Sequence, residues 1–132
     1  MQLKALIVED DPILQILHQK ILTTLSIDSV IASTGDEAIE ALKNLQLDFI
    51  LMDVNMPVQD GLDASRWIRD EKDLKNRDIL IFALTSFTTP EHTKEILEAG
   101  MNEHLKKPLD SEELKKLLTK YFWSKNPPQQ DT

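Results

Sequence analysis

The feature that most constrains this sequence is a fivefold alternation of short apolar runs with segments of helical periodicity. The first, third and fourth runs are almost continuously apolar, which is typical of strands buried on both faces of a parallel sheet. The runs lie at residues 5–8, 30–32, 49–52, 79–84 and, more weakly, 104–105. A strand–helix unit repeated five times predicts an α/β fold with a doubly wound parallel sheet. Right-handed crossovers place helices on both of its faces.

Capping residues indicate where the intervening helices begin. Polar residues able to cap a helix N-terminus precede four of the segments, and two of them are followed by a proline suited to the first turn. These residues are Asp11, Thr34, Thr89 and Asp110. Gly61 precedes the third segment, and Gly100 ends the fourth. On the first helix we expect one buried apolar stripe, with His18 facing solvent or a partner. The stripe consists of Leu14, Leu17, Ile21, Leu22 and Leu25.

Length and composition exclude several classes of protein. The 132 residues fit one domain, which we place at 1–124, with a flexible tail at 125–132. The absence of cysteine excludes disulfides and thiolate chemistry. A net charge of −8 argues against direct binding of nucleic acid, which needs a basic patch. No apolar run approaches the ~20 residues that span a bilayer, and the N-terminal stretch is too short for a signal peptide, so we expect a cytoplasmic location without membrane insertion.

The residues that end the predicted strands carry the chemistry. Ligands of doubly wound sheets bind at the carboxyl ends of the strands, where this sequence has Glu9, Asp10, Asp53, Thr85 and Lys107. Two unit charges ~4 Å apart repel by about 4 kcal/mol at an effective dielectric near 20, so three neighbouring carboxylates need compensation. A hard divalent cation such as Mg²⁺ supplies it. With the Lys107 charge and the Thr85 hydroxyl, the arrangement predicts an anion site around a carboxylate nucleophile.

A family resemblance rests on these residues and their order. Asp53 at the end of an apolar strand is followed by Met-Pro-Val-Gln-Asp-Gly at 56–61, and the Glu9-Asp10 pair, Thr85 and Lys107-Pro108 stand at matching positions. Over residues 3–122 the sequence resembles the receiver domain of two-component response regulators. It is similar to receivers of hybrid histidine kinases and to stand-alone regulators. The resemblance implies a flavodoxin-like strand order of 2-1-3-4-5.

The resemblance also implies a role for each site residue. Asp53 would be the phosphoryl acceptor, and Mg²⁺, which Mn²⁺ could replace, would bind Asp10 directly, Glu9 through water, Asp53, and the backbone carbonyl of Asn55. Thr85 would be the switch hydroxyl. Lys107 would pair with phosphoryl oxygens, and its bond to Pro108 would be cis.

Two positions depart from the family pattern. His104 stands where the family has its switch aromatic, which suggests a pH-sensitive switch. Phe87 is bulkier than usual and could shield the phosphoryl group from water, whereas Asn55 could orient a hydrolytic water. Phe87 and Asn55 are therefore expected to set the rate of dephosphorylation.

The function implied is a phosphorelay switch rather than an enzyme, one that promotes only its own phosphorylation and dephosphorylation. A histidine kinase or histidine phosphotransfer protein would donate the phosphoryl group. A downstream protein would bind the face formed by the fourth helix, fifth strand and fifth helix, and a homodimer is a further association to consider.

Three alternatives compete with this interpretation. An aspartate-nucleophile phosphatase usually carries Asp-x-Asp after its first strand, whereas Asp53 follows the third strand here. A nucleotide- or flavin-binding domain would need a glycine-rich phosphate loop, but the chain has only three glycines. A receiver-like scaffold that is never phosphorylated is disfavoured by the intact set of Asp10, Asp53, Thr85 and Lys107.

Overall fold

A computed structural model of the chain describes residues 2–54, 61–72, 74–75, 77–86 and 89–123. Within them five parallel strands form one sheet in the order β2-β1-β3-β4-β5, which confirms the predicted fold class and strand order. The strands are β1 (Lys4–Val8), β2 (Asp28–Ala32), β3 (Phe49–Asp53), β4 (Leu80–Thr85) and β5 (Glu103–Lys106). The helices are α1 (Pro12–Thr24), α2 (Gly35–Asn44), α3 (Gly61–Asp70), α4 (Pro90–Glu98) and α5 (Ser111–Tyr121). The predictions for Asn55, Phe87 and the tail at 125–132 lie outside the described residues.

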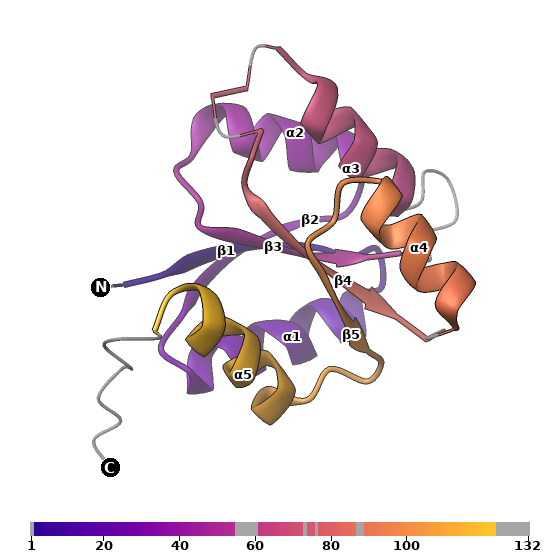
Figure 1. The fold of residues 1–132 in the computed structure, drawn as a ribbon. Helices are drawn as coiled ribbons and strands as arrows, with labels where there is room; N and C mark the ends of the chain where they lie inside the picture. The colour runs from indigo at the N-terminus through magenta and orange to yellow at the C-terminus, as the bar shows by residue number, and fades with distance from the viewer. Residues whose placement is uncertain (1, 55–60, 73, 76, 87–88, 124–132) are drawn as a thin grey trace.

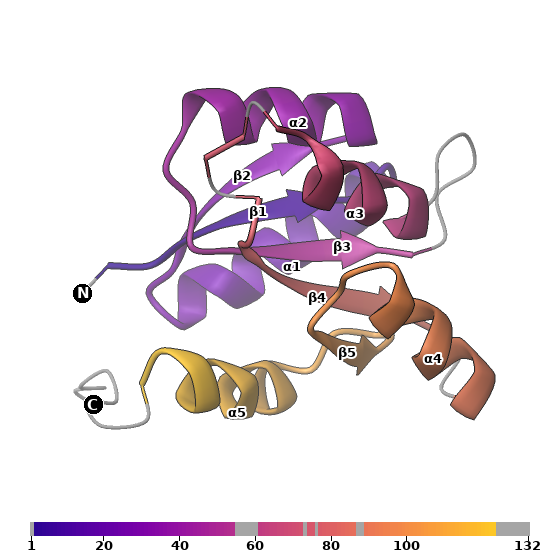
Figure 2. The same cartoon turned by 45° about the horizontal axis from the view of Figure 1, so that its top comes forward.

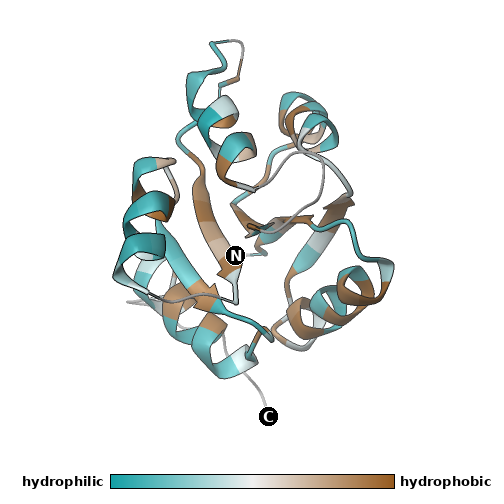
Figure 3. Cartoon of the chain, turned by 90° about the vertical axis from the view of Figure 1, so that its right-hand side faces the viewer, coloured by the Kyte–Doolittle hydropathy of each residue, from teal (hydrophilic) through white to brown (hydrophobic). Residues whose placement is uncertain are grey.

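Helices cover both faces of the sheet, as Figures 1 and 2 show. One apolar core lies under α2, α3 and α4, and a second lies under α1 and α5. The central strands contribute to both, because successive residues point to opposite faces: Leu6 and Val8 enter the first core, and Ala5 and Ile7 the second. Figure 3 shows this apolar interior along the strands and polar outer helix surfaces. None of the described helices combines the length and apolar character needed to cross a membrane.

The predicted caps form as hydrogen bonds. Asp11 Oδ1 accepts from the Ile13 amide at 2.9 Å, and Thr34 Oγ1 accepts from the Glu37 amide at 3.1 Å. In a capping box, the side chain three residues after the cap accepts in return from the amide of the cap residue. Here Glu37 Oε1 accepts from the Ser33 amide at 2.8 Å rather than from the Thr34 amide. This bond fixes the loop between β2 and α2, which borders the end of β1.

The inward face of α1 differs from the predicted stripe. His18 was expected at the surface, but it is only 1% exposed, whereas Leu17 is 40% exposed. The buried row runs through His18 and Leu22, which are four residues apart and therefore one above the other. Ile13 and Ile16 lie on the outer side with Leu17. The apolar residues of α1 thus divide between the core and an exposed face.

Candidate functional site

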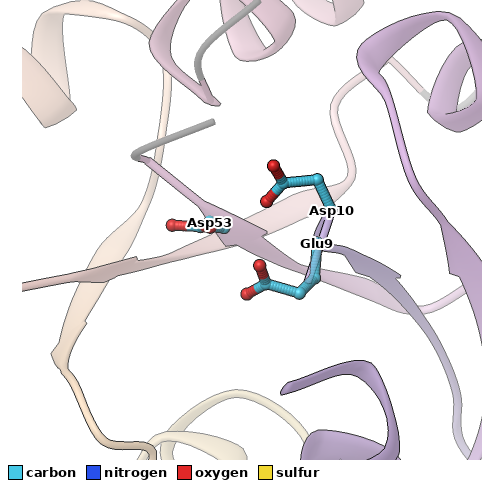
Figure 4. A group of neighbouring side chains, drawn as sticks. All are labelled: Glu9, Asp10 and Asp53. Atoms are coloured by element: carbon cyan, nitrogen blue, oxygen red, sulfur yellow. The ribbon is translucent and has the colours of Figure 1, made fainter. Parts of the chain in front are cut away.

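The carboxyl ends of β1 and β3 bring three carboxylates together. Val8 pairs with Met52 in the sheet, so that Glu9 and Asp53 follow side by side, and Asp10 is the next residue. One oxygen from each of the three side chains lies within 4.8 Å of the others. Figure 4 shows the three side chains gathered beside these strand ends. The predicted acidic cluster is therefore present in the fold.

Two of these carboxylates are buried. Glu9 is 1% and Asp53 is 2% exposed, whereas Asp10 reaches solvent. The pKa of Glu9 is raised to about 8, mainly by burial and with a contribution from the neighbouring Asp53, although the Asp11 amide and Lys107 act in the opposite direction. Glu9 Oε2 accepts from the Asp11 amide at 3.2 Å, but its buried Oε1 has no partner among the described residues. The raised pKa and the unpartnered oxygen of Glu9 both follow from carboxyl groups that are brought together out of water.

Lys107 supplies the positive charge predicted for the site. Its Nζ donates to Asp53 Oδ1 at 2.6 Å, and the Asp53 side chain is only 3% exposed. The Lys107 amide donates to the carbonyl of the buried Thr85 at 2.9 Å, so the end of β4 positions the lysine. The Lys107–Pro108 bond is cis, as predicted. The site therefore draws residues from the ends of β1, β3 and β4 and from the segment after β5.

Gly61 lets α3 begin directly against the end of β3. Its amide donates to the Val54 carbonyl at 3.1 Å. A Cβ at this position would lie 2.3 Å from the Asp53 carbonyl oxygen and 2.9 Å from Met52 Cγ, so only glycine allows this approach. The glycine fixes the backbone that carries Asp53.

The donor set fits a hard divalent cation. Carboxylate oxygens are the ligands that Mg²⁺ and Mn²⁺ prefer, and a cation would partner the unpaired Glu9 oxygen and offset the repulsion among the acids. Glu9, Asp10 and Asp53 would hold it.

His104 lies apart from the acidic cluster. It pairs with Ala83 in the sheet and is half-buried, on the side of β5 that faces α4. There it lines a groove with Pro90 and Leu97. The structure thus brings together five of the predicted site residues, whereas His104 lies outside the acidic cluster and lines the groove beside α4.

Comparison with known proteins agrees with this geometry. The response regulator receiver domain family matches residues 5–119. The chain belongs to this family. It is a receiver domain, and receiver domains are the phosphoryl-accepting signalling switches of phosphorelay systems. The predicted family is therefore confirmed.

Individual relatives place the receiver domain in several contexts. It is 34% identical over 90% of the chain to the probable C4-dicarboxylate response regulator DctR of Halalkalibacterium halodurans, and it spans about half of that protein (51%). Among solved structures, it resembles the receiver domain of sensor histidine kinase PA1611 from Pseudomonas aeruginosa, described with a magnesium ion in the active site cleft. The identity is 32%, the TM-score is 0.80, and 92% of this chain and 98% of that chain are covered.

It also resembles the receiver domain of Ssk1 from Saccharomyces cerevisiae, solved together with the histidine phosphotransfer protein Ypd1. The identity is 29%, the TM-score is 0.80, and 91% of this chain and 88% of that chain are covered.

Sequence reasoning missed Gln15 beside the site and placed His18 wrongly at the surface. Gln15 was not singled out, although it contacts the loop that carries the acidic pair. No pattern in the sequence identifies it, because its partners are a backbone carbonyl and a residue 18 positions away. The burial of His18 could have been found from its spacing of four residues to Leu14 and Leu22.

Proposed function

We propose that Asp53 of this receiver domain accepts a phosphoryl group from the phosphohistidine of a histidine kinase or a histidine phosphotransfer protein. The observation that carries the proposal is the buried Asp53 carboxylate, which lies 2.6 Å from Lys107 Nζ and beside Glu9 and Asp10. A carboxylate that needs both a cation and a lysine is suited to receiving a phosphoryl group, whose oxygens bind the same positive charges.

The transfer exchanges one bond for another. A carboxylate oxygen of Asp53 forms a bond to phosphorus as the bond between phosphorus and the donor imidazole nitrogen breaks, and the electron pair stays on that nitrogen. Lys107 pairs with the transferred oxygens, and the Thr85 hydroxyl bonds one of them. Bound Mg²⁺, or Mn²⁺ in its place, would neutralise charge on the phosphoryl oxygens. Glu9, Asp10, Asp53 and the Asn55 carbonyl would hold the cation, and the PA1611 receiver, described with magnesium in its cleft, supports this.

The donor is proposed to dock on the exposed apolar face of α1, formed by Ile13, Ile16 and Leu17. These side chains are 76%, 56% and 40% exposed, and the helix that carries them begins next to the acidic pair. Apolar side chains gathered in this way favour a protein partner. The complex of the Ssk1 receiver with Ypd1 supports a phosphotransfer protein as one such donor.

The phosphorylated state is proposed to be recognised at the face formed by α4, β5 and α5. A groove of about 710 Å³ lies there, lined by Pro90, Thr93, Lys94, Leu97, Glu98 and His104. Attraction of Thr85 to the phosphoryl group would bias β4 and β5, which are paired at Thr85 and Lys106. His104 would make this coupling sensitive to pH, and a downstream protein or a second copy of the chain would bind the face.

The remaining proposals follow from the sequence and the family. Asn55 and Phe87 would set the lifetime of the aspartyl phosphate, by orienting and by excluding water respectively. The domain would act in the cytoplasm and catalyse only its own phosphorylation and dephosphorylation. Phosphoryl lifetimes of Phe87→Ala and Phe87→Glu that equal the wild-type lifetime would remove the shielding role.

The central proposal is tested with a small-molecule phosphodonor. Acetyl phosphate and Mg²⁺ should add one phosphoryl group that is labile to hydroxylamine, and Asp53→Asn should abolish it. Asp63→Asn is the matched control, because Asp63 is exposed on α3 and pairs with Arg66 at 3.2 Å, away from the acidic cluster. Intact-mass and peptide analysis locate the group. A phosphohistidine or phosphoserine in place of phosphoaspartate would contradict the assignment.

A further inference from the structure

Gln15 of α1 contacts two loops that border the acidic cluster. Its Nε2 donates to the Glu9 carbonyl at 2.6 Å and to Ser33 Oγ at 3.1 Å. Because a backbone carbonyl only accepts hydrogen bonds, the amide nitrogen rather than the amide oxygen must face Glu9. Both protons of this nitrogen are therefore used, one on the loop after β1 and one on the loop after β2.

With the Gln15 contact, both backbone groups of Glu9 take part in hydrogen bonds. The Glu9 amide donates to the Ala32 carbonyl at 3.0 Å, and the Asp11 amide donates to Glu9 Oε2 at 3.2 Å. Gln15 holds the remaining backbone group, the Glu9 carbonyl. That carbonyl belongs to the peptide plane that joins Glu9 to Asp10.

The direction of the exposed Asp10 side chain depends on this peptide plane. Asp10 follows a restrained carbonyl and precedes a restrained amide, so its backbone is fixed from both sides. Rotation of the Glu9–Asp10 peptide would turn the Asp10 carboxylate away from Glu9 and Asp53. Ser33 is itself held, since its amide donates to Glu37 Oε1 at 2.8 Å, and so Gln15 is anchored to α2 as well.

We propose that Gln15 is a positioning residue that orients the Glu9–Asp10 peptide and so sets the affinity of the site for Mg²⁺. The inference rests on the proposed metal site and adds a residue that does not touch the metal. Its effect is confined to the cation-binding step. Once Mg²⁺ is saturating, the cation itself holds Asp10 in place.

The decisive variant is Gln15→Met, which keeps the size of the side chain but removes the donor. The affinity for Mg²⁺ should fall about tenfold, which corresponds to about 1.4 kcal/mol. The Mg²⁺ concentration that gives half-maximal phosphorylation by acetyl phosphate should rise by the same factor, while the maximal rate should be unchanged. Ser33→Ala should have a smaller effect, because it leaves the bond to Glu9 intact.

The matched control is Gln19→Met, one turn further along α1. Gln19 lines a separate groove between α1 and β2, so its replacement should alter neither quantity. Binding is measured by titrating the whole chain with Mg²⁺ alone and following backbone amide shifts, and thermal unfolding of each variant is recorded in parallel.

Each outcome separates the inference from the proposed function. If the wild type shows no Mg²⁺-dependent shifts that Asp10→Asn removes, the metal site itself is wrong. If that site is present but Gln15→Met binds Mg²⁺ like the wild type, the positioning role is wrong and the proposed function stands. Equal losses in Gln15→Met and Gln19→Met, or a maximal rate of Gln15→Met that stays low at saturating Mg²⁺, would also overturn the positioning role.

Discussion

The half-buried guanidinium of Arg69 and the buried carboxyl groups of Glu9 and Asp53 lie at opposite ends of the strands. Arg69 donates to the Gly100 carbonyl and to Asn102 Oδ1, both at 2.9 Å, and to the Arg77 carbonyl at 2.5 Å. Its acceptors are neutral, and they join α3 to the segments that precede β4 and β5. At the other end, like charges crowd together and Glu9 Oε1 lacks a partner among the described residues.

This difference separates structural from functional burial of charge. The Arg69 donors all have acceptors, and these hydrogen bonds hold the connected elements together. A buried oxygen without a donor, such as Glu9 Oε1, instead favours the binding of a cation or another ligand that can contact it. Burial lowers the pKa of Arg69, yet the guanidinium stays charged because its ordinary pKa is so high. We therefore expect variants at the Arg69 end to alter stability and variants at the acidic end to alter phosphorylation.

The largest expected effect lies at the acidic end. Asp10→Asn should lower the rate of Mg²⁺-dependent phosphorylation by at least about 10²-fold, because a divalent cation contributes several kcal/mol of charge stabilisation to phosphoryl transfer. The free energy of unfolding without Mg²⁺ should stay equal or rise, since a negative charge beside Asp53 is removed. Rates with acetyl phosphate and urea denaturation measure the two quantities. A large loss of stability in Asp10→Asn would break the comparison.

The converse effect is expected at the other end. Arg69→Met should lower the free energy of unfolding by about 3 kcal/mol, because Asn102 Oδ1 and two carbonyls lose charged donors. Phosphorylation of the folded protein should continue at nearly the wild-type rate. Arg66→Met is the control on the same helix, where an exposed pair with Asp63 should change stability by less than about 0.5 kcal/mol. Equal stability of the two variants would show that the Arg69 network is not needed.

The sequence predicted the acidic end better than the Arg69 end, and the reason is physical. Glu9, Asp10, Asp53, Thr85 and Lys107 follow apolar strands, and parallel strands bring their carboxyl ends to one edge whatever the details of packing. The five strands and their order were accessible in the same way. Arg69 gives no such signal, because its acceptors are backbone carbonyls and an asparagine 33 residues away.

His18 and Leu17 show a second limit. Both occur in an amphipathic helix, and residue type alone placed the leucine inside and the histidine outside. The geometry of α1 reverses this, since the row through residue 18 faces the sheet. Hydrophobicity predicts that a helix has a buried face, but contacts with the sheet decide which row of side chains occupies it.

His18 allows the comparison to be sharpened. Its Nδ1 is buried without a partner among the described residues, and burial, together with the charge of Lys107, lowers its pKa. His18→Leu should therefore raise the free energy of unfolding by about 1 kcal/mol at neutral pH. Because the unfolded chain binds a proton at the ordinary pKa of 6.5 and the folded chain only at lower pH, the wild type should lose stability as the pH falls below about 6.5.

The His18→Leu variant should lose less stability than the wild type as the pH falls below about 6.5. Urea denaturation between about pH 5 and pH 8 tests this, with His92→Gln on α4 as the control. A variant with the same pH slope as the wild type would mean that His18 gains a partner in solution.

The smallest effect is expected where a satisfied network lies near the surface. Glu103 Oε2 accepts from Tyr121 Oη at 2.5 Å and from Lys120 Nζ at 2.7 Å, which joins β5 to α5. Tyr121→Phe should cost only about 0.5–1 kcal/mol, because the ring keeps its packing against Phe82, at 5.7 Å between centroids, and water can replace the hydroxyl. Comparison of this variant with Arg69→Met tests whether a hydrogen-bond network must be more deeply buried to contribute strongly to stability.

The pH dependence of this cost identifies its source. Burial raises the pKa of Glu103, but the hydrogen bonds from Lys120 and Tyr121 lower it more, so that it lies below its ordinary value of 4.5. A depressed acidic pKa stabilises the fold above the unfolded value and ceases to do so as the pH falls through the folded value. The difference between wild type and Tyr121→Phe should therefore shrink below about pH 4.5, and it should be smaller and independent of pH when Glu103→Gln is the background, because glutamine offers only a neutral acceptor. A cost that stays the same at every pH and in the Glu103→Gln background would show that the Glu103 carboxylate is not its source, because Tyr121→Phe removes only the hydroxyl and leaves the ring in place.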